Sequence, residues 1–286
     1  MRGVCSDHCS ADQIVMLPTP VRFLHTEHAE IDSTNAALSR RASRGESIHL
    51  RALSAGVQTA GRGQRGRTWH AAAGDAMLLS VGWHFPKSRS LEGLSLAVGA
   101  CVANLLRTLA ADERAVVLKW PNDILLAQAG QVPTKLGGIL IETLAIDRDT
   151  RAAVIGIGIN FATPEISPDA VVAEVFTPFV LFAPLAPAGL HEISDITISE
   201  LITALLPALA QDLTQFSVNG FAPFKPLWWS MRAYASDANQ RVAVRTPDGN
   251  EIVGAMVELT SSGALVIESA SGRHTLVSGQ ISLRPA

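Results

Sequence analysis

The sequence predicts an α+β protein in which a mixed β-sheet flanked by helices is followed by a small β-barrel. Up to about residue 236, apolar runs of strand length alternate irregularly with only a few helix-length patterns. From about residue 239, short alternating strands are separated by Gly-containing turns. The chain has 286 residues and is 48% hydrophobic, which is enough for one large and one small domain, each with a core.

Charge and cysteine content limit the functional classes. The formal net charge of −3 argues against a general nucleic-acid surface. An odd set of three cysteines, Cys5, Cys9 and Cys101, favours a reducing compartment over a disulfide framework. Cys5, His8 and Cys9 imitate half of a metal site, but no later Cys or His pair completes it. We therefore expect residues 1–17 to be a disordered extension and, without a signal-peptide pattern, the protein to be cytoplasmic.

The longest apolar run, residues 171–190, does not predict a membrane span. Its prolines, Pro178, Pro184 and Pro187, would interrupt a helix and leave carbonyl groups unpaired in lipid. We interpret this run as a buried or ligand-covering loop.

The first helix is predicted by its caps. After an irregular start, residues 32–35 (Asp-Ser-Thr-Asn) offer N-cap oxygens, and Gly45 can end the helix in a left-handed conformation. Residues 48–55 then form a predicted strand that leads into a loop rich in glycine and arginine.

The middle of the chain is predicted to form several strands and one long helix. Residues 77–83 are an apolar run of strand length, and residues 94–111 carry the spaced Leu, Val and Ala of a helix. Residues 115–120 and 139–144 are strand-like and are joined in the form of a hairpin. Residues 154–159 form a further buried strand, in which two glycines allow close approach.

The last third begins with a helix and ends in the barrel. Residues 198–216 form a predicted helix kinked at Pro207, and residues 220–234 pack on the core through two tryptophans. We place the larger domain at residues 18–236 and the barrel at residues 237–286. The predicted barrel strands are residues 241–246, 251–259, 264–268 and 275–277.

Residues 58–69 (Gln-Thr-Ala-Gly-Arg-Gly-Gln-Arg-Gly-Arg-Thr-Trp) form an anion-binding candidate. Glycine lets successive N–H groups turn toward one anion, and the three arginines add fixed positive charge. A solvated surface turn is the alternative. A P-loop is disfavoured because Arg67 stands where that motif has lysine.

Several common catalytic motifs are missing from the sequence. It contains neither the Gly-x-Ser-x-Gly elbow of serine hydrolases nor the His-Glu-x-x-His of zinc hydrolases. The glycines at 156 and 158 lack the third glycine and following helix of a dinucleotide site. What remains, an anion-binding loop, two lysines and an aspartate near a lysine, favours a phosphorylated or acidic small molecule.

Five motifs together resemble the biotin–protein ligases in order and wording. They are Ser33-Thr-Asn35, residues 58–69, Lys119-Trp-Pro-Asn-Asp123, Lys135-Leu-Gly-Gly-Ile-Leu-Ile-Glu142 and Gly156-Ile-Gly-Ile-Asn160. The resemblance runs from about residue 24 to the C-terminus. It implies a catalytic domain of the class II aminoacyl-tRNA synthetase and biotin ligase type, followed by an SH3-like barrel.

The resemblance implies a two-step, ATP-dependent reaction. The carboxylate of biotin attacks the α-phosphate of ATP to give biotinyl-5′-AMP and pyrophosphate, and a lysine of a biotin carboxyl carrier protein domain then takes the biotinyl group. Arginine, lysine and the Mg²⁺ bound with ATP can offset the charge at the α-phosphate, without a metal site in the protein itself. A lipoate-type ligase and a non-catalytic biotin- or nucleotide-binding regulator are the alternatives.

The family implies a set of ligand-binding residues. Short polar side chains suit the fixed donors and acceptor of a ureido ring. The implied biotin-binding residues are Ser33, Thr34, Asn35, Gln58, Arg62, Gly63, Gln64, Trp69, Ser80, Lys135, Gly138, Ile139, Gly156 and Gly158. The implied ATP or adenylate ligands are Arg62, Arg65, Arg67, Lys119, Asn122, Lys135 and Asn160.

Three of the chain's residues are implied to be catalytic: Lys135, Arg62 and Asp123. Lys135 resembles the lysine near the reacting carboxylate and α-phosphate. Asp123 resembles the carboxylate that helps the acceptor lysine lose its proton, although a turn-forming Asp is the simpler interpretation. The chain departs from the family at Gln64, where the best-studied bacterial member has Arg, and in a longer hairpin over residues 124–134.

The resemblance also sets expectations for partners and motion. Only 32 residues precede Ser33, too few for the DNA-binding winged helix of some family members, so we expect a monofunctional ligase without a DNA or membrane partner. A homodimer is left open. The glycine content of residues 58–69 predicts a mobile flap across the adenylate.

Overall fold

The structure is a computed structural model that describes residues 21–112, 115–164, 185–234, 241–245, 250–277 and 282–285. The expected N-terminal extension, most of the apolar run 171–190 and the domain boundary near residue 236 lie outside these residues. At the end of that run, residues 186–188 lie beside the strand that carries Lys135, where Lys135 N donates to Ala186 O at 2.7 Å.

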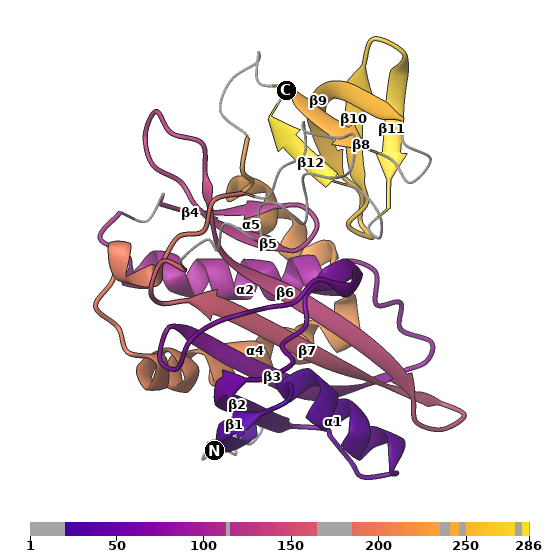
Figure 1. Ribbon diagram of the computed structural model, residues 1–286. Helices are drawn as coiled ribbons and strands as arrows, with labels where there is room; N and C mark the ends of the chain where they lie inside the picture. Colours follow the sequence, from indigo (N-terminus) through magenta and orange to yellow (C-terminus); the bar gives the residue numbers. More distant parts are fainter. Residues whose placement is uncertain are drawn as a thin grey trace, which may run out of the picture.

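A mixed seven-stranded sheet forms the larger part of the molecule, in the order β1-β2-β3-β7-β6-β5-β4 (Figure 1). β1 pairs with β2 in parallel, whereas the other neighbours pair antiparallel. The predicted α+β class is therefore confirmed. The strands are β1 (Leu24–Ile31), β2 (Arg51–Gln58), β3 (Ala76–Pro86), β4 (Val116–Lys119), β5 (Asp123–Leu126), β6 (Thr134–Ala145) and β7 (Thr150–Asn160).

Helices cover both faces of this sheet. Side chains of successive strand residues point to opposite faces, so Leu53 and Val154 pack with α1 (Thr34–Ser43) while their neighbours join the larger core. That larger core contains α2 (Leu94–Leu109) and α4 (Ile198–Asn219), which pack on each other and on the sheet.

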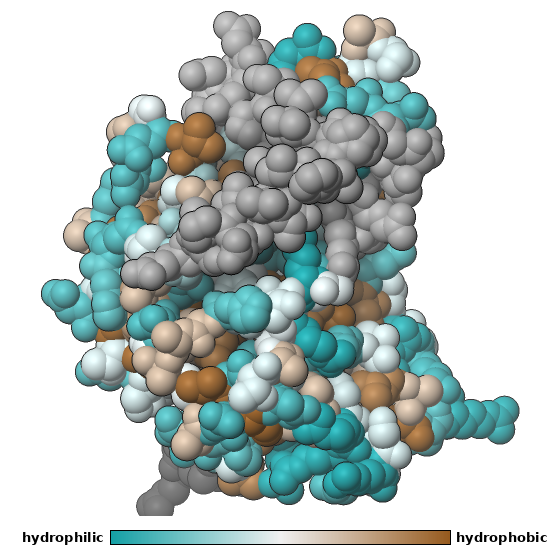
Figure 2. Space-filling model, viewed as in Figure 1, coloured by the Kyte–Doolittle hydropathy of each residue, from teal (hydrophilic) through white to brown (hydrophobic). Residues whose placement is uncertain are grey.

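The predicted first helix is confirmed as α1. Ser33 is its N-cap, and its hydroxyl accepts a hydrogen bond from Ala36 N at 3.3 Å. The helix ends at Ser43, just before Gly45 in the left-handed conformation. The N-cap contact fixes Thr34 and Asn35, the first helical residues, at the end of α1 that faces the sheet. The outer surface around α1 is largely hydrophilic (Figure 2).

Among the described residues, α4 is long and apolar enough, by length and composition, to cross a membrane. It begins with a capping box in which Thr197 Oγ1 accepts from Glu200 N and the Glu200 carboxylate accepts from Thr197 N. Its apolar residues are buried against α2 and β3, and Pro207 lies inside the helix as expected. The helix is thus part of the protein core. The following short helix, α5 (Lys225–Ser230), buries Trp228.

The C-terminal part is a five-stranded antiparallel sheet in the order β11-β10-β9-β8-β12, at the end of the molecule opposite α1 (Figure 1). The four predicted strands are present and β12 is added. Trp120 Nε1 donates to Gly263 O at 3.0 Å and joins this sheet to the larger domain. The strands are β8 (Val242–Arg245), β9 (Glu251–Leu259), β10 (Leu265–Ser269), β11 (Gly272–Leu276) and β12 (Ser282–Pro285).

Two features of the larger sheet differ from the sequence prediction. β1 lies in the stretch expected to be irregular, because an exposed edge strand carries mostly polar residues and shows no apolar alternation. β6 begins at Thr134, five residues before the expected start at 139, and β5 adds a strand inside the expected hairpin connection. Gly137 and Gly138, which suggest a turn, instead pair within the ladder to β7.

Candidate active site

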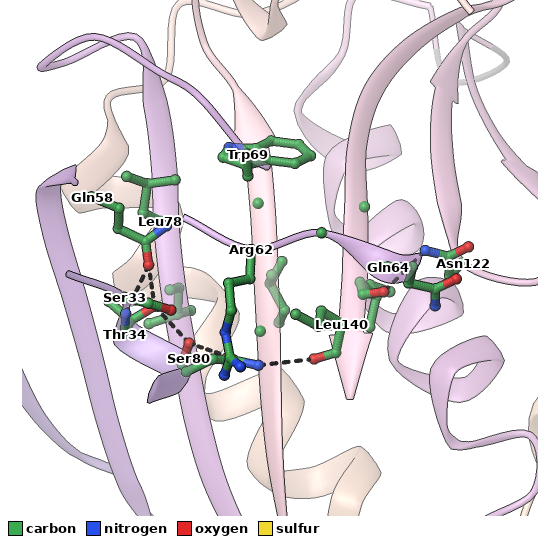
Figure 3. A pocket seen from close by; sticks show the side chains of 18 of the residues that line it. Ser33, Thr34, Gln58, Arg62, Gln64, Trp69, Leu78, Ser80, Asn122 and Leu140 are labelled. Carbon is green, nitrogen blue, oxygen red and sulfur yellow. Dashed lines mark hydrogen bonds between the residues drawn. The ribbon is translucent and has the colours of Figure 1, made fainter. Parts of the chain in front are cut away.

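A cavity that opens to solvent lies between the N-terminus of α1, the loop 61–69 and strands β3, β6 and β7. Figure 3 shows Ser33, Thr34, Gln58 and Ser80 gathered at one end, Asn122 and Gln64 at the other, and Trp69 and Arg62 between them. Residues from all five sequence motifs therefore meet around one space.

The end beside α1 carries an uncharged hydrogen-bond network. Thr34 N donates to Gln58 Oε1 at 2.7 Å, and the hydroxyl groups of Thr34 and Ser80 lie 2.7 Å apart. Ser80 Oγ in turn donates to Asn35 Oδ1 at 2.6 Å. Ser33, Thr34, Asn35 and Ser80 are all buried. Because the groups hold one another in place, they present a fixed pattern of donors and acceptors to the cavity.

Glu142 extends this network and was given no role by the sequence interpretation, although it ends the motif that begins at Lys135. Its Oε2 accepts from Asn35 Nδ2 at 3.0 Å and from the guanidinium of Arg62 at 2.7 Å. Arg62 lies in the loop that follows Gln58, the last residue of β2. The hydrogen-bond network therefore connects the end of β2 to this loop through α1, β3 and β6.

Two glycines of β7 bring the side chains close to the sheet. A Cβ on Gly156 would lie 2.4 Å from Asn35 Oδ1, and a Cβ on Gly158 would lie 2.8 Å from the ring of Trp69. The Trp69 ring thus lies directly over β7. Its Nε1 is buried and has no hydrogen-bond partner among the described residues, so it can donate to a ligand.

The opposite end is charged and centres on Asp123. Its Oδ2 lies 2.8 Å from Lys119 Nζ, and its Oδ1 lies 2.7 Å from Lys135 Nζ. The side chains of Lys119, Asp123 and Lys135 are 7%, 13% and 32% exposed, respectively. Burial alone would raise the pKa of Asp123, but the ammonium groups of Lys135 and Lys119 outweigh it and hold that pKa well below its usual range.

Lys135 is the member of this triad that faces the cavity. It is the most exposed of the three, and its Nζ lies 5.9 Å from the centroid of the Trp69 ring. Asn160 is buried and supports the backbone of this residue, because its Nδ2 donates to Lys135 O at 3.3 Å and to Ala188 O at 3.2 Å. The position of the ammonium is thus set by Asp123 and by the strand below it.

The loop over the cavity is folded as a small hairpin. Gly63 N donates to Arg67 O at 2.7 Å, and Trp69 N donates to Gly61 O at 3.0 Å. A Cβ on Gly61 would lie 2.3 Å from Trp69 O, so this position needs glycine. The two ends together suit an acid with an uncharged polar head group. The neutral network can bind the head group, and the cations lie where the carboxylate of the acid would react with a phosphate.

Sequence models of two protein families match the chain. The Biotin/lipoate A/B protein ligase family matches residues 29–160, and the Biotin protein ligase C terminal domain matches residues 238–284. The Bifunctional ligase/repressor BirA of Escherichia coli K12 is 34% identical over 284 residues, covering 94% of this chain and 81% of that protein. The chain belongs to the biotin protein ligases.

Other members of the family agree over most of the chain. The Biotin--[acetyl-CoA-carboxylase] ligase of Mycobacterium tuberculosis is 32% identical over 261 residues, covering 87% of this chain and 85% of that protein. The structure of the biotin protein ligase from Aquifex aeolicus in complex with biotin and ATP aligns with a TM-score of 0.69 at 27% identity. That alignment covers 92% of this chain and 99% of that chain.

In this biotin protein ligase, all the residues expected to bind biotin line the cavity, together with Asn122 from the expected ATP site. Ile139 contributes mainly through its backbone, since its O accepts from Asn122 Nδ2 at 3.1 Å while its side chain is buried and approaches Gly99 of α2. Sequence patterns alone did not indicate the lining residues Leu78, Leu79, Leu140 and Ile157, which look like ordinary strand residues.

Three of the remaining expected ATP ligands, Arg67, Lys119 and Asn160, lie outside the cavity lining, as does Asp123. Arg67 lies over a neighbouring hollow that it shares with Arg62 and Glu142. Lys119, Asp123 and Asn160 lie behind or beneath Lys135 rather than in the cavity wall. The side chain of Arg65 is not part of the described structure. Direct contact of these residues with ATP stays a prediction.

Proposed function

We propose that this cavity is where the ligase activates biotin with ATP, and that the acceptor is a lysine of the carrier domain of a biotin-dependent carboxylase. The observation that carries the proposal is the presence of both halves of the chemistry in one cavity. A neutral network suited to a ureido ring lies at one end, and the Lys135 ammonium lies at the other. The family relatives named for biotin and acetyl-CoA carboxylase support the same substrate and carrier.

In the first step, an oxygen of the biotin carboxylate attacks the α-phosphorus of ATP. A new P–O bond forms, the bond from the α-phosphorus to the bridging oxygen breaks, and pyrophosphate leaves. We assign Lys135 the role of stabilising the negative charge that builds up between these two anions, with Arg67, over the neighbouring hollow, closer to the phosphates and Arg62 on the biotin side. Trp69 would cover the bound biotinyl group and offer its free indole N–H.

In the second step, the amine of the carrier lysine attacks the acyl carbon of biotinyl-AMP. An amide bond forms, AMP leaves and the amine loses a proton. A base works best when its pKa lies near the working pH, and the two lysines hold the pKa of Asp123 far below it. We therefore assign Asp123 to holding Lys135 in place rather than to removing this proton.

Mg²⁺ belongs in this proposal as the ion that accompanies ATP. Among the described residues, no group of three or more His, Cys, Asp or Glu side chains is arranged to hold a metal ion. We propose that the ion enters on the phosphates. Because the net charge is −3, the proposal includes no DNA partner, and specific operator binding in a gel-shift assay at physiological salt would contradict this part.

The decisive experiment mixes the protein with biotin, MgATP and a purified carrier domain and weighs the carrier by mass spectrometry. The expected result is a mass increase of one biotinyl group on the carrier lysine, with AMP and pyrophosphate released. Biotinyl-AMP without transfer would favour a regulatory protein. If neither biotinyl-AMP nor biotinylated carrier forms, the assignment is contradicted. Transfer of lipoate in place of biotin would favour the related lipoate-type activity.

A further inference from the structure

We propose that Lys119 is a positioning residue for adenylate formation: as a second, permanently buried partner of Asp123, it lets Lys135 leave that carboxylate and contact the phosphates. The inference rests on the proposed function. It gives Lys119 a role that differs from direct contact with ATP, because Lys119 acts on the substrates only through Asp123 and Lys135.

The geometry of the triad separates the tasks of the two lysines. Each ammonium contacts its own oxygen of Asp123, Lys119 at 2.8 Å from Oδ2 and Lys135 at 2.7 Å from Oδ1. Only 7% of the Lys119 side chain is exposed, against 32% for Lys135. Lys135 also lines the cavity, whereas Lys119 does not. One cation is therefore fixed in the protein interior and the other can turn toward a ligand.

The backbone around Lys119 keeps it in place. Lys119 pairs with Asp123 across the tight β4–β5 hairpin, and the preceding Leu118 exchanges backbone hydrogen bonds with residues 231 and 233. Trp120, the next residue, is 1% exposed and donates to Gly263 O. The backbone that carries Lys119 is therefore held on both sides, with the ammonium on the oxygen of Asp123 that Lys135 does not contact.

Electrostatics explain why a second partner is needed. A buried carboxylate that loses its only counter-ion is strongly destabilised, since desolvation is then uncompensated. If Lys135 were the sole partner of Asp123, its movement to the phosphates would leave such a carboxylate behind. Because Lys119 stays on Oδ2, Asp123 keeps a counter-ion throughout, and Lys135 can exchange one oxygen ligand for another at little cost.

The test uses Lys119→Met, which removes the buried charge but keeps the length of the side chain. Of the two lysines that contact Asp123, only Lys135 then remains. Movement of Lys135 to the phosphates therefore becomes unfavourable. We expect single-turnover pyrophosphate release to slow by about 10- to 100-fold, with the biotin Kd changed by less than about twofold. Lys119→Gln, which keeps a donor to Oδ2 without the charge, should fall between this variant and the unmodified protein.

The double variant Lys119→Met/Asp123→Asn provides the decisive comparison. A neutral amide at 123 needs no counter-ion, so Lys135 is free again and adenylate formation should recover to within about tenfold of the unmodified protein. A merely structural role of Lys119 predicts no such recovery, because the second substitution would add to the damage. Unfolding midpoints of all the variants control for loss of structure.

The outcomes separate this inference from the proposed function. If the unmodified protein forms no biotinyl-AMP, the proposed function fails. If it does, and Lys119→Met is as fast as the unmodified protein, or the double variant is as slow as the single one, the positioning role of Lys119 is overturned. Should Lys119→Met be unfolded, the ratio of rates between Lys119→Gln and Lys119→Gln/Asp123→Asn decides the question in the same way.

Discussion

The two ends of the cavity solve different problems with different chemistry. At the α1 end, neutral side chains are buried and hydrogen-bonded to one another, as in the contacts of Thr34 with Gln58 and Ser80. At the β5–β6 end, one carboxylate is held by two ammonium groups, and one of these groups faces the cavity. Neutral, mutually fixed groups recognise a shape without a large desolvation penalty, whereas movable charge stabilises a reaction in which charge is redistributed.

The largest effect is expected from Asp123→Asn, which tests whether the charged end is held together by its own ion pairs. The variant removes the carboxylate that the buried Lys119 ammonium contacts at 2.8 Å, so the free energy of unfolding should fall by about 3–5 kcal/mol at pH 7. Chemical denaturation measures this value. The double variant with Lys119→Met is the control and should recover most of the loss.

The same variant has a defined pH dependence. The pKa of Asp123 is lowered in the folded protein, so its contribution to stability is fully present above the unfolded pKa of about 4 and is lost as the pH falls below that value. The stability difference between the unmodified protein and Asp123→Asn should therefore narrow between about pH 5 and pH 3. A difference that stays constant over this range would show that charge is not its cause.

Lys135→Ala tests whether the two ends can be separated functionally. Loss of one preorganised cation at the reacting atoms should slow adenylate formation by about 10²- to 10³-fold, while the neutral end still binds biotin. Rapid-quench measurement of biotinyl-AMP and calorimetric measurement of biotin binding check the two parts. Lys225→Ala, which removes a lysine paired with Glu258 outside the cavity, is the matched control and should leave both unchanged.

Thr34→Val gives the converse result at the neutral end. It keeps the shape of the side chain but removes the hydroxyl that links Gln58 and Ser80, and it leaves buried polar groups unpaired. We expect biotin affinity to fall by about 10- to 100-fold, with the rate of adenylate formation at saturating biotin within about threefold. An equal loss in both quantities would mean that the two ends do not act separately.

The smallest effect is expected from Glu142→Gln, which weakens the link between the neutral end and the loop. Arg62 and Glu142 are 46% and 30% exposed, and such a pair contributes only about 0.2–1 kcal/mol. Amide hydrogen exchange in residues 60–68 should be a few-fold faster, with biotin affinity reduced by less than about fivefold. Arg40→Gln breaks the exposed pair with Asp32 and should not change exchange in the loop.

Most of the neutral end of the cavity could be predicted from the sequence, but the arrangement of the charged side chains at the other end could not. Ser33, Thr34 and Asn35 follow from capping and from the family motif, and the structure places them as one helix N-terminus. By contrast, the contact of Lys119 and Lys135 with the same carboxylate depends on the pairing of β5 with β6 across the hairpin 126–134. Side-chain spacing in one sequence does not reveal such long-range pairing, and a long polar connection hides its register.

The fold was predicted best where apolar periodicity is strong. Residues 251–259 match β9, and the long helix expected at residues 94–111 ends two residues earlier, at Leu109. The prediction failed at β1, whose edge position requires little apolar surface. It also failed at the start of β6, where Gly137 and Gly138 mimic a turn. Glu142 could have been suspected as an acid ending an apolar strand motif.

The hydrogen bond from Trp120 to Gly263 ties the reacting end of the cavity to the C-terminal sheet. Trp120 lies in the chain between Lys119 and Asp123, so its contact with the C-terminal sheet helps to hold the backbone that carries two members of the charged triad. Truncation before β8 would therefore not produce a minimal enzyme. Exchange of this module between ligases would require the surface that receives Trp120 to be transplanted with it.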